Sequence, residues 1–159
     1  MDYTIEHYET KKEILREIVI SNNKTYYPKT LYEVQVSDLN KDDIINITSA
    51  YEVTNNYKFN VMIASSVTLG SIGSTTLPFT IDEGRGYNVT PAMHHGCSYH
   101  VRQFKISRDM PGENVVSTVL WSASDAASPS LNDKLKIESG YGHLDVVVYK
   151  NHKTEQDYP

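Results

Sequence analysis

Residue types that bind metal ions gather in one short stretch, which reads His94-His95-Gly96-Cys97-Ser98-Tyr99-His100. Thiolate and imidazole are donors that zinc prefers. If Cys97 to Ser107 forms an extended strand, Cys97 and His100 point to opposite faces, and only the turn residues His94 and His95 could join either of them. We therefore expect a polar turn that enters a strand, with no metal and no cofactor; the candidates for an ion are His94, His95, Cys97 and His100. At a threefold axis, one histidine per chain could still gather three imidazoles around an ion.

No segment has the pattern of a catalytic centre. The serines of Gly70-Ser71-Ile72-Gly73-Ser74 lack the strand, sharp turn and helix that expose a nucleophile, and no sequence argument selects a His and an Asp to accompany them. The carboxylates of Asp42-Asp43, Asp82-Glu83 and Asp145 would need to face one another across a cleft to hydrolyse a glycoside, and spacing does not establish that. We expect no catalytic residues and a protein that is not an enzyme.

The composition is that of an ordinary soluble globular protein. A length of 159 residues suits one domain, which we place at residues 1–150, followed by a polar C-terminal tail at 151–159. The net charge of −5 and the dispersed acidic residues argue against nucleic acid as a partner. No apolar run approaches the roughly 18 residues of a membrane span, and no leader follows Met1, so we expect no membrane partner and synthesis in a cytoplasm.

The clearest structural pattern runs from Asp43 to Gly70. One strand places Ile45, Ile47, Ser49, Tyr51 and Val53 on a single face, and a second strand does the same with Phe59, Val61, Ile63, Ser65, Val67 and Leu69. The residues Thr54-Asn55-Asn56-Tyr57 between them favour a turn. We therefore predict a β-hairpin in which the second strand runs back along the first.

Shorter strands are predicted along the rest of the chain. They are Leu31 to Val36, Cys97 to Ser107, Val115 to Ala123, Lys134 to Glu138 and Leu144 to Tyr149. The second of these has apolar residues of both parities, so we expect a bulge near Gln103. The third is apolar on both faces and follows a turn at Asp109-Met110-Pro111-Gly112, and Trp121 is its expected core anchor.

Two segments between these strands are less regular. Ser122 to Ser130 is small and polar, which predicts a surface loop. Lys11 to Val19 has apolar residues at helical spacing but also a β-branched cluster, so helix and strand both stay open. Short strands with turn signals between them and no alternating helices predict an all-β fold, an antiparallel two-sheet β-sandwich of jelly-roll type.

Four phrases of the sequence carry a resemblance to a known class of proteins. They are Leu31-Tyr32-Glu33-Val34-Gln35-Val36, the segment Asp43 to Gly70, Asn88-Val89-Thr90-Pro91-Ala92-Met93-His94-His95, and Gly140-Tyr141-Gly142-His143-Leu144. Together they resemble small β-sandwich virion surface proteins of tailed marine bacteriophages, of the head decoration or fibre type. The resemblance implies a homotrimer or a module on a symmetric shell that contacts capsid proteins, other virion proteins or a host surface, and it implies a location in the virion.

Several functions are compatible with these observations. The leading hypothesis is a non-enzymatic virion structural protein that works through oligomeric contacts. The bias of twelve tyrosines against three phenylalanines fits such an interface, and equally fits simple filling of strands. The alternatives are a carbohydrate-binding or host-receptor-binding module that would take a host surface glycan, a metal-dependent enzyme of cupin-like architecture, and a cytokine-like or complement-like trimeric jelly roll.

Overall fold

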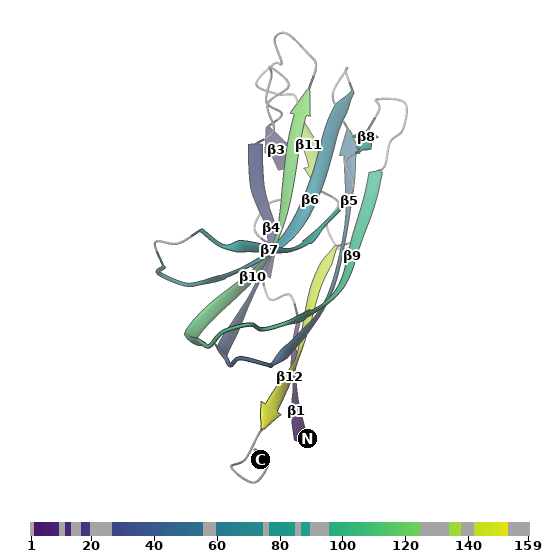
Figure 1. Ribbon diagram of the computed structural model, residues 1–159. Coiled ribbons are helices and arrows are strands. Elements are labelled where there is room, and N and C mark those ends of the chain that lie inside the picture. The colour runs from purple at the N-terminus through teal and green to yellow at the C-terminus, as the bar shows by residue number, and fades with distance from the viewer. Residues whose placement is uncertain are drawn as a thin grey trace.

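A β-sandwich is formed by the residues that the computed structural model describes, which are 2–9, 12–13, 17–19, 27–55, 60–74, 77–84, 87–89, 96–124, 134–137 and 142–152. Within these ranges the chain forms twelve strands in two sheets of six, and every strand pair is antiparallel (Figure 1). The predicted all-β, antiparallel two-sheet sandwich of jelly-roll type is confirmed.

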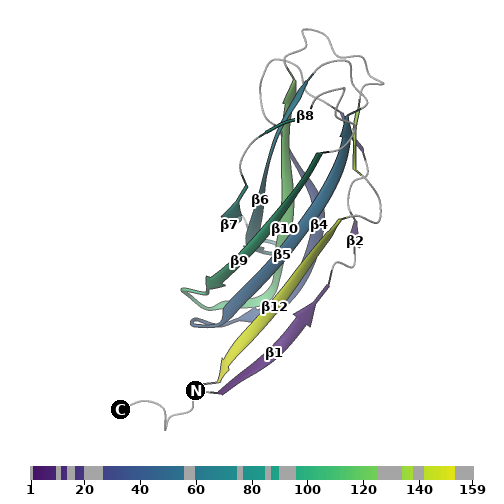
Figure 2. The same cartoon turned by 90° about the vertical axis from the view of Figure 1, so that its right-hand side faces the viewer.

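The first sheet, sheet A, is built around one long central strand, β5. Its order is β1 (Asp2–Tyr8), β12 (His143–His152), β5 (Ile44–Asn55), β11 (Lys134–Ile137) and β3 (Glu17–Val19). The strand β9 (Gly96–Lys105) pairs with the opposite edge of β5, because the same β5 residues that pair with β12 also pair with β9. The strands β1, β12, β5 and β9 therefore lie side by side in one layer (Figure 2).

The second sheet, sheet B, forms the other layer. Its order is β2 (Lys12–Glu13), β4 (Tyr27–Leu39), β10 (Met110–Ser124), β6 (Val61–Ser71) and β7 (Phe79–Glu83), and β8 (Tyr87–Val89) also pairs with β6. The longest of these strands, β10, lies between β4 and β6 and pairs with each over most of its length.

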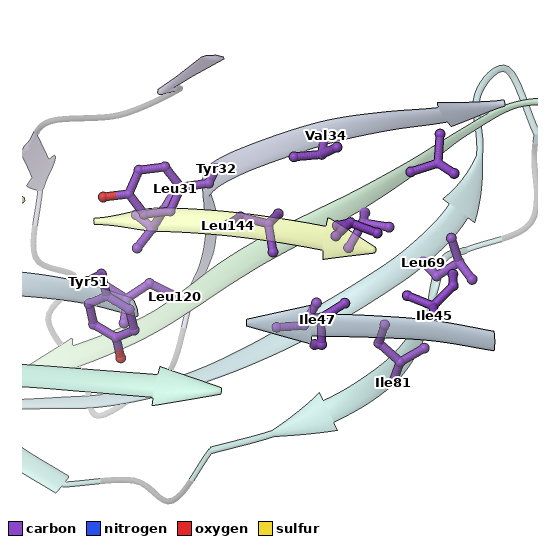
Figure 3. Packing of buried hydrophobic residues seen from close by; sticks show 14 of the residues in the cluster. Leu31, Tyr32, Val34, Ile45, Ile47, Tyr51, Leu69, Ile81, Leu120 and Leu144 are labelled. Carbon is purple, nitrogen blue, oxygen red and sulfur yellow. The ribbon is translucent and has the colours of Figure 1, made fainter. Parts of the chain in front are cut away.

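The hydrophobic core fills the space between the two sheets. Residues of β5 alternate between buried and half-exposed positions, and those of β6 do so over most of their length, as the two-residue period of a pleated strand requires. Their buried side chains meet those of β4, β7, β10 and β12 (Figure 3), and the cluster includes Leu31, Tyr32, Val34, Ile45, Ile47, Tyr51, Leu69, Ile81, Leu120 and Leu144.

The predicted hairpin from Asp43 to Gly70 is wrong, although both of its strands exist. β5 lies in sheet A and pairs with β9, β11 and β12, whereas β6 lies in sheet B and pairs with β7, β8 and β10. The two strands therefore lie in opposite sheets instead of sharing a hydrogen-bonded ladder. Alternation identifies the buried face of a strand but does not identify the strand that pairs with it. The next strand along the chain shows the same alternation whether it pairs in the same sheet or packs against the core from the opposite sheet.

The predicted bulge near Gln103 is also wrong. β9 pairs with β5 without interruption from Ile44↔Lys105 to Val53↔Gly96. Within this regular strand Tyr99 and Val101 point outward and are 75% and 69% exposed, while His100 is buried. The prediction of a bulge was wrong because the inward position carries a polar residue, His100, whereas the outward positions carry the apolar residues Tyr99 and Val101.

Trp121 is not a core residue, so the expectation that it anchors the core is wrong. Its side chain is 37% exposed, whereas Val116, Thr118 and Leu120 on the other face of the strand are fully buried. A two-layer sandwich gives each sheet one face toward the core and one away from it, so even a central strand that is apolar on both faces buries only one of them fully.

The ends of β10 also differ from the predicted turn and loop. The strand begins at Met110 and passes through a register irregularity between Met110 and Glu113, where Gly112 has a φ of +81°. The expected turn at Asp109 to Gly112 is therefore partly a bulge inside the strand. At the other end the strand continues to Ser124, so Ser122 to Ser124, the first three residues of the predicted loop, belong to β10; residues 125–130 lie outside the described ranges.

The undecided segment Lys11 to Val19 is strand wherever it is described. Lys12–Glu13 forms β2 and Glu17–Val19 forms β3, while residues 11 and 14–16 lie outside the described ranges. β12 ends at His152, two residues beyond the predicted end of the domain at 150, and residues 153–159 are outside the described part of the chain. Within that part, no helix has the length and hydropathy that crossing a membrane requires.

A buried ion pair joins three of the long strands at one end of the sandwich. Lys150 Nζ lies 2.7 Å from Asp43 Oδ2, and these side chains are 10% and 0% exposed. The two carboxylate oxygens of Asp43 also accept hydrogen bonds from the backbone N–H groups of Asn40 and Asn151, each at 2.8 Å, and Lys150 donates to the carbonyl oxygen of Asp38. This pair holds the turn between β4 and β5 against the strand β12.

Candidate functional site

A serine, a histidine and an aspartate form a hydrogen-bonded chain between the two sheets. The oxygen Oγ of Ser65 lies 2.8 Å from Nε2 of His100, and Nδ1 of the same ring lies 2.7 Å from Oδ2 of Asp82. Ser65 is on β6 and Asp82 on β7, both in sheet B, while His100 is on β9 in sheet A. The three side chains therefore link the sheets near the β7 and β9 edges of the sandwich.

Strand alternation and one pairing irregularity place these residues. Ser65 occupies an inward position of β6, between Ile63 and Val67, and His100 occupies an inward position of β9. The pairing of β6 with β7 shifts register between Val67 and Thr68, which brings Asp82 opposite Val67. The shift is the type of bulge that redirects a side chain near the rim of a sheet.

Gly84 lies close against this cluster. Its backbone N–H donates to the carbonyl oxygen of Ser65 at 2.8 Å, and a Cβ at this position would lie 3.0 Å from Cε1 of His100 and 3.1 Å from Oγ of Ser65. Any larger side chain at Gly84 would press on the histidine ring, so the absence of a Cβ allows the chain to pass over the cluster.

The hydrogen-bond pattern is that of a Ser-His-Asp triad, but its setting does not suit catalysis. In a triad the histidine takes the serine proton while the aspartate orients the ring, and the serine oxygen must be open to substrate beside oxyanion donors. Ser65 is 4% exposed and His100 is 2% exposed. None of the three lines the cavity at Phe79 and Phe104 or the groove at Tyr3 and Tyr149. The geometry supports a buried, satisfied polar cluster that holds the sheets together.

Sequence reasoning missed this cluster because its members lie on three strands of two sheets. A usable signal was present: Ser65 falls on the predicted inward face of its strand, and uninterrupted alternation in β9 would have placed His100 inward as well. The assumed bulge near Gln103 hid that parity.

The metal candidates predicted from sequence are only partly described. His94 and His95 lie outside the described ranges, and Cys97 belongs to β9 while its side chain is not described. Both ring nitrogens of His100 already have hydrogen-bond partners, so an ion bound by His100 would have to displace Ser65 or Asp82. The expectation that this segment binds no metal stays a prediction.

The outward surface of sheet A carries an uncharged band that crosses four strands. Pairing places Tyr149 beside Ile5 and Ile44, and Asn46 beside Val147 and Gln103, all on the side away from the core. We call this band the outer face; its most exposed members are Tyr3, Ile5, Tyr99 and Val101, at 42%, 62%, 75% and 69%. Charged residues are found beside the outer face, at Asp145 and Lys105, and not within it.

A shallow groove of about 210 Å³ lies in the outer face. It is lined by Tyr3, Ile44, Asn46, Gln103 and Tyr149. Two aromatic side chains with two carboxamides can stack on a flat ligand and hydrogen-bond to its edge. The Oδ1 atom of Asn46 is buried and has no hydrogen-bond partner within the described part of the chain.

A second cavity, of about 350 Å³, lies at one end of the sandwich. Its lining includes Phe79, Phe104, Ile106, Arg108 and Met110. The rings of Phe79 and Phe104 contact each other in a tilted arrangement with centroids 5.8 Å apart, across the same β7 and β9 edges that carry the polar cluster. The two sheets are thus joined at this edge by an aromatic contact and by the cluster.

Comparison with known proteins identifies the fold and no more. No protein-family model matches the chain, and no curated protein matches it. A chain from the structure of infectious bursal disease virus, Gx strain, is similar with a TM-score of 0.62 at 8% identity, over 96% of this chain and 37% of that chain. The corresponding values for the Gt strain are 0.57, 9%, 96% and 38%. The Eiger TNF structure from S. frugiperda gives 0.47 and 8%, over 96% of this chain and 95% of that one.

The two virus structures share the β-sandwich of this protein. The present chain spans well under half the length of those viral chains. At such low identity the similarity shows a common architecture, and it does not transfer an activity or a partner.

Proposed function

We propose that the protein is a non-enzymatic virion structural protein, a capsid decoration or fibre module that acts through contacts between its own copies and with other virion proteins. The observation that carries this proposal is the outer face of sheet A. It has no charged member, it carries Tyr3, Tyr99 and Tyr149, and Asp145 and Lys105 lie beside it, which is the composition of a protein interface with a polar rim. The shared fold with chains of a virus structure supports the virion setting.

The occupant of the outer face is a second copy of the same chain, in a homotrimer. The face extends over both edge strands β1 and β9, and an exposed strand edge in a β-sandwich invites association unless it is covered. A closed ring of three chains would cover the apolar side chains of Tyr99, Val101 and Ile5 at the same time. In this proposal the protein is synthesised in a host cytoplasm and is then incorporated into the virion.

The test is the mass of the native protein in solution by light scattering, with a matched pair of variants. Val101→Lys adds a charge to one of the most exposed apolar positions of the outer face, and Gln35→Lys adds the same charge at an exposed position of β4 in sheet B. We expect a trimer for the natural chain and for Gln35→Lys, and a folded monomer for Val101→Lys. A monomeric natural chain would contradict the proposal.

The groove favours a second candidate function, binding of a host surface glycan. Tyr3 and Tyr149 could stack on a sugar ring while Asn46 and Gln103 hydrogen-bond to its hydroxyl groups. Glycan-array binding that disappears in Tyr149→Ala and Gln103→Ala, in a protein that is monomeric, would favour this function over the interface. A trimer that covers the groove and binds no glycan would exclude it.

A further inference from the structure

Three metal-binding side chains converge on the outward side of sheet A, away from the segment that the sequence singled out. They are His7 of β1, Glu9 just after β1, and Asp145 of β12. One donor atom from each lies within 4.8 Å of the other two. His7 and Glu9 are exposed and Asp145 is half-buried, so solvent and ions reach the cluster.

The backbone explains why these side chains meet. β1 pairs antiparallel with β12, with His7 opposite Val147 and Tyr8 opposite Val146. Continuing this pairing by one residue beyond Tyr8 brings Glu9 beside Asp145. His7 and Glu9 share one side of the chain because they are two residues apart, and Tyr8 between them packs against the core. The convergence therefore follows from strand register and does not depend on a loop.

A further histidine stands next to one of the three, Asp145. His143 is two residues before Asp145 on β12, and its Nε2 lies 3.9 Å from Oδ2 of Asp145. Zinc takes four ligands at about 2.0–2.2 Å, so the donor atoms would close in by about 1 Å, which partly exposed side chains achieve by rotating. Two imidazoles with two carboxylates suit zinc-class ions, whereas calcium and magnesium prefer oxygen ligands alone.

We propose that His7, Glu9 and Asp145 bind one divalent transition-metal ion of the zinc class, with His143 as the fourth ligand. The ion would tie the N-terminal edge strand β1 to β12. All four donors come from one chain, so binding requires no assembly and does not rest on the proposed function.

Isothermal titration of the metal-free full chain with Zn²⁺ tests the proposal. We expect one ion per chain, and a loss of affinity of about tenfold or more in each of His7→Ala and Asp145→Asn. His152→Ala is the matched control, because His152 is also an exposed histidine, at the far end of the same strand β12. It should bind Zn²⁺ like the natural chain. Circular dichroism of each variant establishes that it is folded before its affinity is compared.

Cobalt and calcium separate the proposed site from the alternatives. Co²⁺ should give visible absorption bands of a four-coordinate site, and these should weaken in His143→Ala. Millimolar Ca²⁺ should not displace Zn²⁺ if imidazole is a ligand. Absence of Zn²⁺ binding, displacement by Ca²⁺, or binding that survives in both His7→Ala and Asp145→Asn would overturn the proposal; the last result would place the ion elsewhere, for example near His94 and His95.

Discussion

Oγ of Ser65 and Nε2 of His100 lie 2.8 Å apart although the two residues belong to opposite sheets. The other ring nitrogen of His100 is bonded to Asp82, so the histidine has a partner on both sides. A buried polar group that is fully hydrogen-bonded specifies one arrangement of the elements around it, because any other arrangement leaves it unsatisfied. The cluster thus determines how β9 lies over β6 and β7.

Replacement of His100 tests this structural role. His100→Ala should lower the free energy of unfolding by about 2–4 kcal/mol, because it opens a cavity and leaves the Ser65 hydroxyl and the Asp82 carboxylate without their partner. Ser65→Ala removes one hydrogen bond and should cost about 1 kcal/mol. Urea unfolding measures both values. Equal free energies of unfolding for His100→Ala and the natural chain would show that the cluster does not stabilise the contact between the two sheets.

The same cluster should be inert as a nucleophile. Because Ser65 is 4% exposed, a fluorophosphonate probe should not modify it in the folded protein. Mass spectrometry of the treated protein provides the measurement. An adduct on Ser65 that forms in the natural chain and fails to form in His100→Ala would reveal an active triad and refute the non-enzymatic proposal.

The buried pair of Asp43 and Lys150 should matter far more than an exposed pair nearby. Lys150→Met leaves the carboxylate of Asp43 buried without its cation, and should lower the free energy of unfolding by about 3–5 kcal/mol. Lys105→Met breaks the pair with Asp42, where the atoms are 3.6 Å apart and Lys105 is 67% exposed, and should cost at most about 1 kcal/mol. Chemical denaturation of the two variants in parallel measures both losses in the free energy of unfolding. Similar losses in both would argue against the strong burial of Asp43.

Tyr8 should ionise at unusually high pH. Burial, together with a hydrogen bond to the Glu6 carboxylate and its charge, raises the pKa of Tyr8 to about 12. Because the unfolded value is about 10, the folded state holds this proton more tightly, so the stabilising contribution is complete below pH 10 and is lost as pH rises toward 12. An absorbance titration at alkaline pH should show a step near pH 12 that is absent from Tyr8→Phe. A step that remains in Tyr8→Phe would assign it to another residue.

Trp121 should contribute little to stability despite its size. Its side chain is 37% exposed on the outer side of β10, so Trp121→Ala should cost about 1 kcal/mol, whereas the neighbouring Leu120→Ala should cost about 2–5 kcal/mol because Leu120 is fully buried. Thermal or urea unfolding compares the two. Quenching of the single tryptophan by acrylamide should be efficient in the natural chain. A loss for Trp121→Ala that matches Leu120→Ala would show that the tryptophan is covered, for instance by another copy of the chain.

The sequence alone was sufficient for the class of the fold and for the inward face of its clearest strands. Ile45, Ile47 and Val53 on β5, and Val61 and Val67 on β6, are buried as alternation predicted, since pleating leaves no other way to place their side chains against a core. Turn-forming residues between such strands, with no helices alternating with them, indicated an antiparallel sandwich.

Only the tertiary structure decided which strands pair and which polar residues meet. Alternation is a local property of one strand, whereas pairing depends on contacts between segments far apart in the chain, and a partner in the same sheet or across the core satisfies the same pattern. For this reason the hairpin of β5 and β6 was predicted wrongly. The same reason explains why the sequence did not predict the link between Ser65 and His100 or the convergence of His7 with Asp145. Each arrangement depends on the register of strands that are brought together only in the folded chain.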